Sequence, residues 1–129
     1  MNKFFFELNM WFESDYDVEG LKDKFKIEPT EVVKYNDCDY EDNKTAQFFY
    51  QTGLYEDCDV EEELYDFISE MHEKTIGVKE ILKENKGELY INVVYKKLED
   101  KNEMANITLS REVLEMLGDM GAHFEVCKF

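Results

Sequence analysis

Apolar and polar residues alternate along several stretches of the chain, and this pattern is typical of a strand with one buried face. In the clearest stretch, residues 4–12, every second residue is apolar. Alternation returns in residues 89–96, 105–109 and 122–126, whereas residues 32–35 and 45–52 are β-prone stretches of β-branched and aromatic residues. These segments are rich in β-branched and aromatic residues, which favour strands. We therefore predict a strand in each of them.

Helical spacing marks three other segments. The longest has a single apolar stripe at intervals of three or four residues: Leu64, Ile68, Met71, Thr75, Val78 and Leu82. Asp59 and Glu62 stand before it with the spacing of a capping box. Gly87 is a natural terminator for this helix, and Gly77 predicts a kink or a division within it. Shorter stripes predict two more helices: Val18, Leu21 and Phe25 before Pro29, and Val113, Leu114, Leu117 and Met120 between Ser110 and Gly121.

The order of these elements predicts an α+β fold. It reads βαββαβ, as in the ferredoxin-like pattern, followed by a further β-α-β. We expect a mixed or antiparallel sheet with the helices mainly on one face, because each helix has only one apolar stripe. The 129 residues fit one domain spanning 1–129.

The charge of the chain limits its partners. Thirty-one acidic residues face 15 basic ones, which gives a net charge of −16, and Arg111 is the only arginine. Nucleic acid and anionic membranes are therefore poor partners, whereas basic proteins are favoured. The three cysteines have no CxxC spacing, and no apolar stretch resembles an export signal or a membrane span. We expect a cytoplasmic protein with reduced thiols.

Two short motifs resemble a known bacterial family, domain of unknown function 4279. One is the turn Ile27-Glu28-Pro29-Thr30 after the first helix. The other is the C-terminal helix with its Leu and Glu pattern, followed by Gly121-Ala122 and a last strand. The resemblance covers nearly the whole chain and implies the family's arrangement of strands and helices. It implies no catalytic residues.

Candidate catalytic and metal-binding groups do not form a recognisable site. His123, Glu125 and Cys127 share one face of the last predicted strand, but His123 and Cys127 are about 13 Å apart along it. We interpret this as a solvent-side face, and His72 as a residue at the boundary of the core. The stretch 37–48 imitates an EF-hand loop but has Asp42 and Phe48 where glycine and glutamate are needed. We predict no catalytic residue, metal or cofactor.

Large apolar side chains remain on the sheet face that the helices should leave open. They are Phe5, Trp11, Phe49, Tyr90 and Val94. Exposed aromatic clusters usually mark interaction sites. The face is instead covered if the third helix or the 36–44 loop packs over it. Otherwise a homodimer or a different partner is expected there.

These features lead to two functional hypotheses. The first is a non-catalytic acidic protein-binding module that docks a basic partner, by analogy of fold similar to an immunity protein that neutralises a toxin. Acidic loops containing Asp37, Asp39, Asp57, Asp59 and Glu61 would steer the partner. The alternative is an enzyme or small-ligand-binding protein with a pocket between the sheet and the helices.

Overall fold

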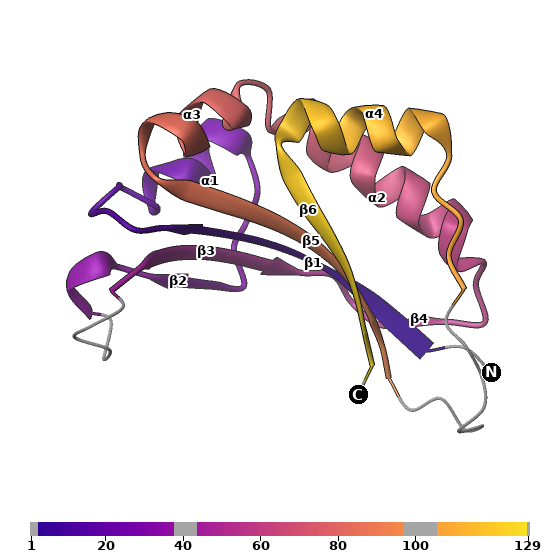
Figure 1. Ribbon diagram of the computed structural model, residues 1–129. Helices are drawn as coiled ribbons and strands as arrows, with labels where there is room; N and C mark the ends of the chain where they lie inside the picture. Colours follow the sequence, from indigo (N-terminus) through magenta and orange to yellow (C-terminus); the bar gives the residue numbers. More distant parts are fainter. Residues whose placement is uncertain (1–2, 38–43, 97–105, 129) are drawn as a thin grey trace.

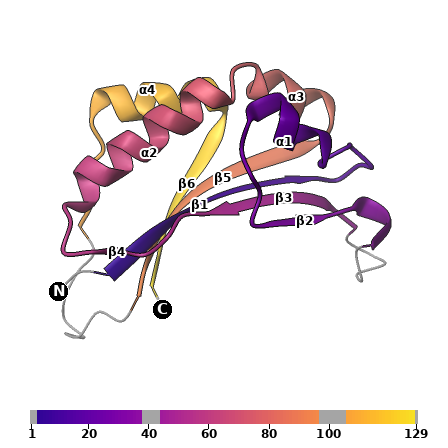
Figure 2. The ribbon, with the colours of Figure 1, turned by 180° about the vertical axis from the view of Figure 1, so that it is seen from behind.

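The computed structural model describes residues 3–37, 44–96 and 106–128. Figures 1 and 2 show an open, twisted sheet with the helices packed on one of its faces. The strands are β1 (Lys3–Phe12), β2 (Glu31–Val33), β3 (Ala46–Gln51), β4 (Tyr55–Glu56), β5 (Gly87–Tyr95) and β6 (Ala122–Lys128). The helices are α1 (Gly20–Phe25), α2 (Val60–Lys74), α3 (Val78–Glu84) and α4 (Arg111–Met120), with a 3-10 turn, η1, at Tyr35–Asp37. The predicted α+β class is confirmed.

The sheet is mixed, with β1 near its centre. The strand order is β2-β3-β1-β5-β6, and the short β4 also pairs with β1. All these pairings are antiparallel except the one between β5 and β6. The order and directions of β2, β3, β1 and β5 agree with the ferredoxin-like prediction. The agreement is partial, because β4 is additional. The division of the long helix into α2 and α3 is one of the two outcomes that Gly77 predicts.

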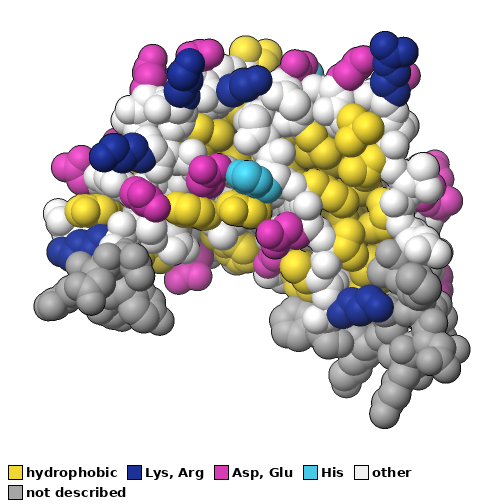
Figure 3. Space-filling model, in the orientation of Figure 1, with side chains coloured by type: hydrophobic (Ala, Val, Ile, Leu, Met, Phe, Trp, Pro, Cys, Tyr) yellow, Lys and Arg dark blue, Asp and Glu magenta, His cyan; other side chains and the backbone are white. Residues whose placement is uncertain are grey.

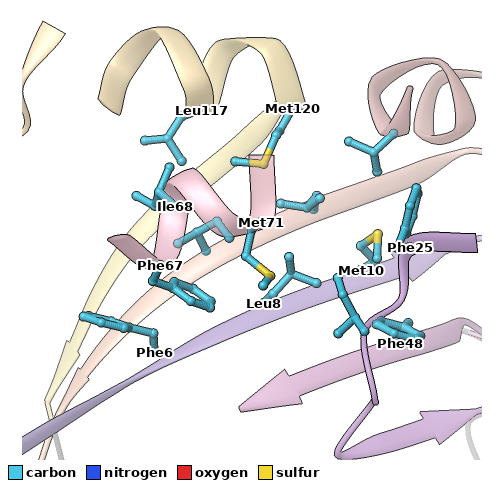
Figure 4. Close-up of a cluster of buried hydrophobic side chains, with 14 of the residues drawn as sticks. Phe6, Leu8, Met10, Phe25, Phe48, Phe67, Ile68, Met71, Leu117 and Met120 are labelled. Carbon is cyan, nitrogen blue, oxygen red and sulfur yellow. The ribbon is translucent and has the colours of Figure 1, made fainter. Parts of the chain in front are cut away.

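The core lies between the sheet and the helices. The even-numbered residues of β1, from Phe4 to Phe12, are fully buried on the helix side. Figure 4 shows three of them, Phe6, Leu8 and Met10, on the side of the sheet where Phe25 of α1, Phe67 and Met71 of α2, and Leu117 of α4 lie. Thr75 is the buried polar residue in the described core, and its hydroxyl donates to the Met71 carbonyl at 2.7 Å. The alternation in the sequence therefore locates the buried face of β1 correctly.

The predicted long helix is divided in two. Gly77 has φ of 88°, in the left-handed region that favours glycine, and α3 begins immediately after it. The helix stripe nevertheless stays on one side, because both Met71 in α2 and Val78 in α3 are buried. Side chains cap the N-termini of two helices, and one of them is the predicted Asp59. Asp59 accepts from the backbone N–H groups of Glu61 and Glu62, and the Ser110 hydroxyl accepts from the Val113 N–H.

Several local predictions are wrong. Residues 106–110 form no strand: Ile107 and Leu109 pack against the core from an irregular segment, and the Thr108 N–H donates to the Glu61 carboxylate instead of a neighbouring strand. Residue 105, where this strand was predicted to begin, is outside the described residues. Tyr35 belongs to η1 rather than to a strand.

Leu114 lies outside the buried face of α4 and is 54% exposed. Gly87 does not terminate the helix but opens β5, where its lack of a side chain lets Phe12 and Leu82 approach.

Candidate functional site

The candidate site is the sheet face opposite the helices, here called the open face. No helix or strand within residues 3–37, 44–96 and 106–128 lies over it, and α4 packs on the other side (Figures 1 and 2). The third helix therefore does not cover this face, which removes one of the alternatives, while most of the 36–44 loop is outside the described residues. Strand register fixes which side chains share this face. On the four longer strands they are Lys3, Phe5, Glu7, Asn9, Trp11, Gln47, Phe49, Gln51, Glu88, Tyr90, Asn92, Val94, His123, Glu125 and Cys127.

A row of rings crosses the open face from β1 to β6. The Trp11 and Tyr90 rings are almost parallel, at an interplanar angle of 12° and a centroid distance of 6.4 Å. The Tyr90 ring stacks on the His123 imidazole at 4.6 Å. His123 Nε2 in turn lies 2.8 Å from a carboxylate oxygen of Glu88. Three strands thus hold Trp11, Tyr90 and His123 in a fixed order with a carboxylate beside them.

Carboxylates and amides fill the positions between the rings. Glu7 lies opposite Asn92, whose Nδ2 donates to Glu7 Oε1 at 3.3 Å, and Glu125 lies on the other side of Asn92. In the described strands the basic side chains, Lys3 and Lys128, stand at strand ends. Figure 3 shows a histidine among acidic and apolar side chains on this side of the molecule. The open face therefore combines aromatic surface with negative charge.

The five apolar residues predicted for this face all lie on it but are not equally accessible. Trp11, Phe49 and Tyr90 are half-buried, and they keep part of their surface in solvent. Phe5 and Val94 are only 8% and 3% exposed, which corrects the expectation that they are available. They lie directly opposite each other, and Val94 has Cys127 on its other side. The accessible apolar patch is therefore centred on Trp11, Phe49 and Tyr90.

The predicted acidic loops do not join this patch in the part of the chain that the structure describes. Asp37 is exposed in η1, and Asp57 is exposed just after β4, with a left-handed φ of 55°. Asp59 caps α2, and Glu61 Oε1 accepts from the Thr108 N–H. Asp39 is outside the described residues. The acidic residues therefore contribute to the overall field, and two of them also have structural contacts.

Cys127 lies on the open face but is not poised as a nucleophile. Burial raises the pKa of its thiol, and the negative charges of Glu125 and Glu7 raise this pKa further. A raised thiol pKa leaves little reactive thiolate near neutral pH. His123, the nearest candidate base in the sequence, is instead engaged with Glu88 and Tyr90. The geometry gives no support to a cysteine–histidine pair.

Two surface clefts involve other parts of the molecule. One, of about 300 Å³, is lined by residues 15–19 and 34–36. It includes Tyr16, and burial together with the negative charge of Asp17 raises the pKa of the Tyr16 phenol. The other, of about 330 Å³, lies between the beginnings of α2 and α4. In it, Tyr65 donates to Glu112 Oε2 at 2.9 Å, and this hydrogen bond raises the pKa of Tyr65. Neither cleft is lined by histidine or cysteine.

His72 connects two helices. Its Nε2 lies 3.2 Å from Asp119 Oδ2, so the ring bridges α2 and α4 at their surface. Among residues 3–37, 44–96 and 106–128, no three His, Cys, Asp or Glu side chains gather in a way that could hold a metal ion. Every helix in these segments is too short or too polar to cross a membrane.

Sequence reasoning missed the polar members of the open face, Asn9, Asn92 and Glu88. Alternation along each strand placed them on the same side as Trp11 and Tyr90. Their contacts depend on the register between strands, which no single-strand pattern contains. Turn signals limit register only in hairpins, and β1 and β5 are far apart in the sequence.

The fold and the open face define a class: an α+β protein whose mixed sheet is covered by helices on one side and has an acidic, aromatic surface on the other. The family model described as Domain of unknown function (DUF4279) matches residues 3–128. The chain therefore belongs to this family, as its sequence motifs predicted. Comparisons with curated proteins and with solved structures found no match.

Proposed function

We propose that this protein is a non-catalytic binding module that docks a basic segment of another protein on its open face. The observation that carries the proposal is the combination of half-buried aromatic side chains with carboxylates on a face that no described element covers. Aromatic residues are enriched at binding hot spots, where they provide apolar contact area. Carboxylates select a partner of opposite charge and accelerate its approach.

The net charge of −16 supports a basic partner rather than a second copy. A symmetric dimer places the same surface patch on both sides of the interface. Through the open face, such a dimer would bring Glu7, Glu88 and Glu125 of both copies together. A basic partner instead neutralises these groups. Exposed acids outside the face, such as Asp37 and Asp57, would act through the long-range field without touching the partner.

The alternative of an enzyme or small-ligand-binding protein requires a polar pocket between the sheet and the helices. The described residues there are apolar side chains packed together, with Thr75 already bonded to Met71. A general acid or base needs a titratable group within reach of a bound substrate. No observation on the described core favours catalysis, so binding is the function proposed.

Trp11 provides a direct test, because it is the only tryptophan in the chain. The probe is a blocked hexapeptide of sequence Lys-Arg-Ser-Lys-Arg-Ser, and the control probe is Glu-Asp-Ser-Glu-Asp-Ser. We expect the basic peptide to change the Trp11 emission saturably and the acidic peptide to leave it unchanged. Because the binding is electrostatic, the dissociation constant should rise at least about fivefold between low and moderate salt.

Two triple variants distinguish a binding site on the open face from general electrostatic attraction to the acidic protein. The first, Glu7→Gln, Glu88→Gln and Glu125→Gln, removes three charges from the open face. The second, Glu70→Gln, Glu73→Gln and Glu84→Gln, removes three from exposed positions on α2 and α3. We expect the first to weaken peptide binding at least about fivefold and the second less than about twofold. Equal weakening by both, or no binding by the parent protein, would contradict the proposal.

A further inference from the structure

The centre of the open face is Asn9 on β1. Strand register places Phe49 of β3 on one side of it and Tyr90 of β5 on the other. Trp11 and Glu7 flank it along its own strand, each about 6.6 Å away from backbone to backbone. Asn9 is thus surrounded by three aromatic side chains and one carboxylate.

Two acceptors at this centre have no donor. Asn9 Oδ1 and Asn92 Oδ1 are enclosed and make no hydrogen bond with any described residue. An enclosed acceptor without a partner destabilises the folded state, because it has lost its hydrogen bonds to water. Asn92 already uses its Nδ2 to donate to Glu7. The neighbourhood is therefore rich in acceptors and negative charge, and what it lacks is a positively charged donor.

The geometry of the rings favours a planar donor. Trp11 and Tyr90 are within 12° of parallel, and Tyr90 and His123 within 19°. The arginine guanidinium is planar, stacks on aromatic rings, is weakly hydrated and has five N–H donors. The lysine ammonium is a compact, strongly hydrated point charge, so it gains less from stacking.

We propose that the centre of the open face is an arginine subsite. The guanidinium of a partner's arginine lies over Asn9, beside Trp11 and Tyr90, and donates to Glu7 and to the Asn9 amide oxygen. Because Asn9 Oδ1 is enclosed, its amide turns about the Cβ–Cγ bond to face the ligand. This assignment rests on the proposed function and specifies the side chain that the face selects.

The test measures selectivity by isothermal titration calorimetry at low salt. The probes are blocked (Arg-Ser)₃, (Lys-Ser)₃ and (citrulline-Ser)₃ peptides. Citrulline keeps the planar shape of arginine without its charge. We expect the arginine peptide to bind at least about fivefold more tightly than the lysine peptide, and the citrulline peptide to bind most weakly.

The variant Asn9→Leu tests whether the arginine subsite lies at the centre of the open face. It should reduce the ratio of arginine-peptide to lysine-peptide affinity to less than about twofold. The matched control Asn106→Leu, an exposed residue outside the open face, should keep this ratio. Equal binding of the arginine and lysine peptides by the parent protein would overturn the arginine subsite and leave the proposed function standing. Binding of neither peptide would overturn both. The parent protein's ratio tests the subsite even where Asn9→Leu does not fold.

Discussion

Gly87 shows how one residue without a side chain permits a close contact. It opens β5 opposite Phe12, and a Cβ built on it would lie 2.5 Å from two Phe12 ring carbons and 2.9 Å from Leu82 Cδ2. Both neighbours are buried and cannot withdraw freely. We expect Gly87→Ala to lower the free energy of unfolding by about 1–3 kcal/mol, as overpacking of a core does. Urea denaturation measures this change.

Gly118 provides the matched control for that substitution. It lies within α4, and nothing is within 4 Å of a Cβ built on it. Gly118→Ala should therefore raise the free energy of unfolding by roughly 0.5–1 kcal/mol through helix propensity. A Gly87→Ala protein as stable as its parent would show that Phe12 and Leu82 yield at little cost.

Single residues also show where sequence reasoning reaches its limit on the open face. Trp11 and Tyr90 are placed on the correct side by alternation alone, because a strand directs successive side chains to opposite faces. Phe5 and Val94 follow the same rule and lie on the same side, but they are buried. The sheet face to which a side chain points is a local property of its strand, whereas the exposed fraction of that side chain depends on neighbours from other parts of the chain.

Asp59 and Asp57 belong to one acidic stretch but have different roles in the elements around them. Asp59 Oδ1 accepts from the Glu61 and Glu62 N–H groups at 2.9 and 3.2 Å and so begins α2. We expect Asp59→Ala to lower the free energy of unfolding by about 1 kcal/mol, a typical cost for a lost N-cap. Thermal or urea unfolding followed by far-ultraviolet circular dichroism measures the loss.

The control substitution is Asp57→Asn. Asp57 has φ of 55°, a conformation that asparagine also tolerates. Like Asp59→Ala, this change removes one negative charge, but it breaks no cap, so stability should stay within about 0.3 kcal/mol of the parent. A loss at Asp57→Asn equal to that at Asp59→Ala would attribute the effect to charge rather than to capping.

The elements most accessible to sequence reasoning are those whose signal is local. β1, α2 and α4 are found from their own periodicity and caps. The segment 106–110 is predicted wrongly because its apolar residues also alternate, although Thr108 bonds to Glu61 instead of a strand. β4 has two residues, too few for any periodicity, and exists because Tyr55 pairs with Phe4. Tertiary partners decide these cases, and the sequence pattern does not contain them.

At the scale of the molecule, the two faces of the sheet have different roles. One side buries the apolar side chains of the strands under the helices, which stabilises the fold. The other side keeps aromatic and acidic side chains in contact with solvent. A stable core on one side allows the open face to carry groups chosen for a partner rather than for packing. Negative charge is the property that the open face shares with the rest of the surface.

This charge affects stability as well as binding. A net charge of −16 on 129 residues makes the folded state repel itself, and the unfolded chain relieves this repulsion by expanding. Salt screens the repulsion, since the Debye length falls from about 30 Å at 10 mM to about 8 Å at 150 mM ionic strength. We therefore expect the melting temperature to rise by roughly 2–5 °C over this range.

Differential scanning calorimetry in NaCl and in KCl measures this rise, and the two salts should agree, because screening depends on ionic strength and not on the cation. The surface ion pairs act in the opposite direction, but they are exposed and individually weak: Lys22 with Glu28 at 3.0 Å and Lys74 with Glu70 at 3.0 Å are examples. Their weakening should not reverse the sign. A melting temperature that falls as NaCl is added would mean that local ion pairs outweigh the repulsion among the 31 acidic residues.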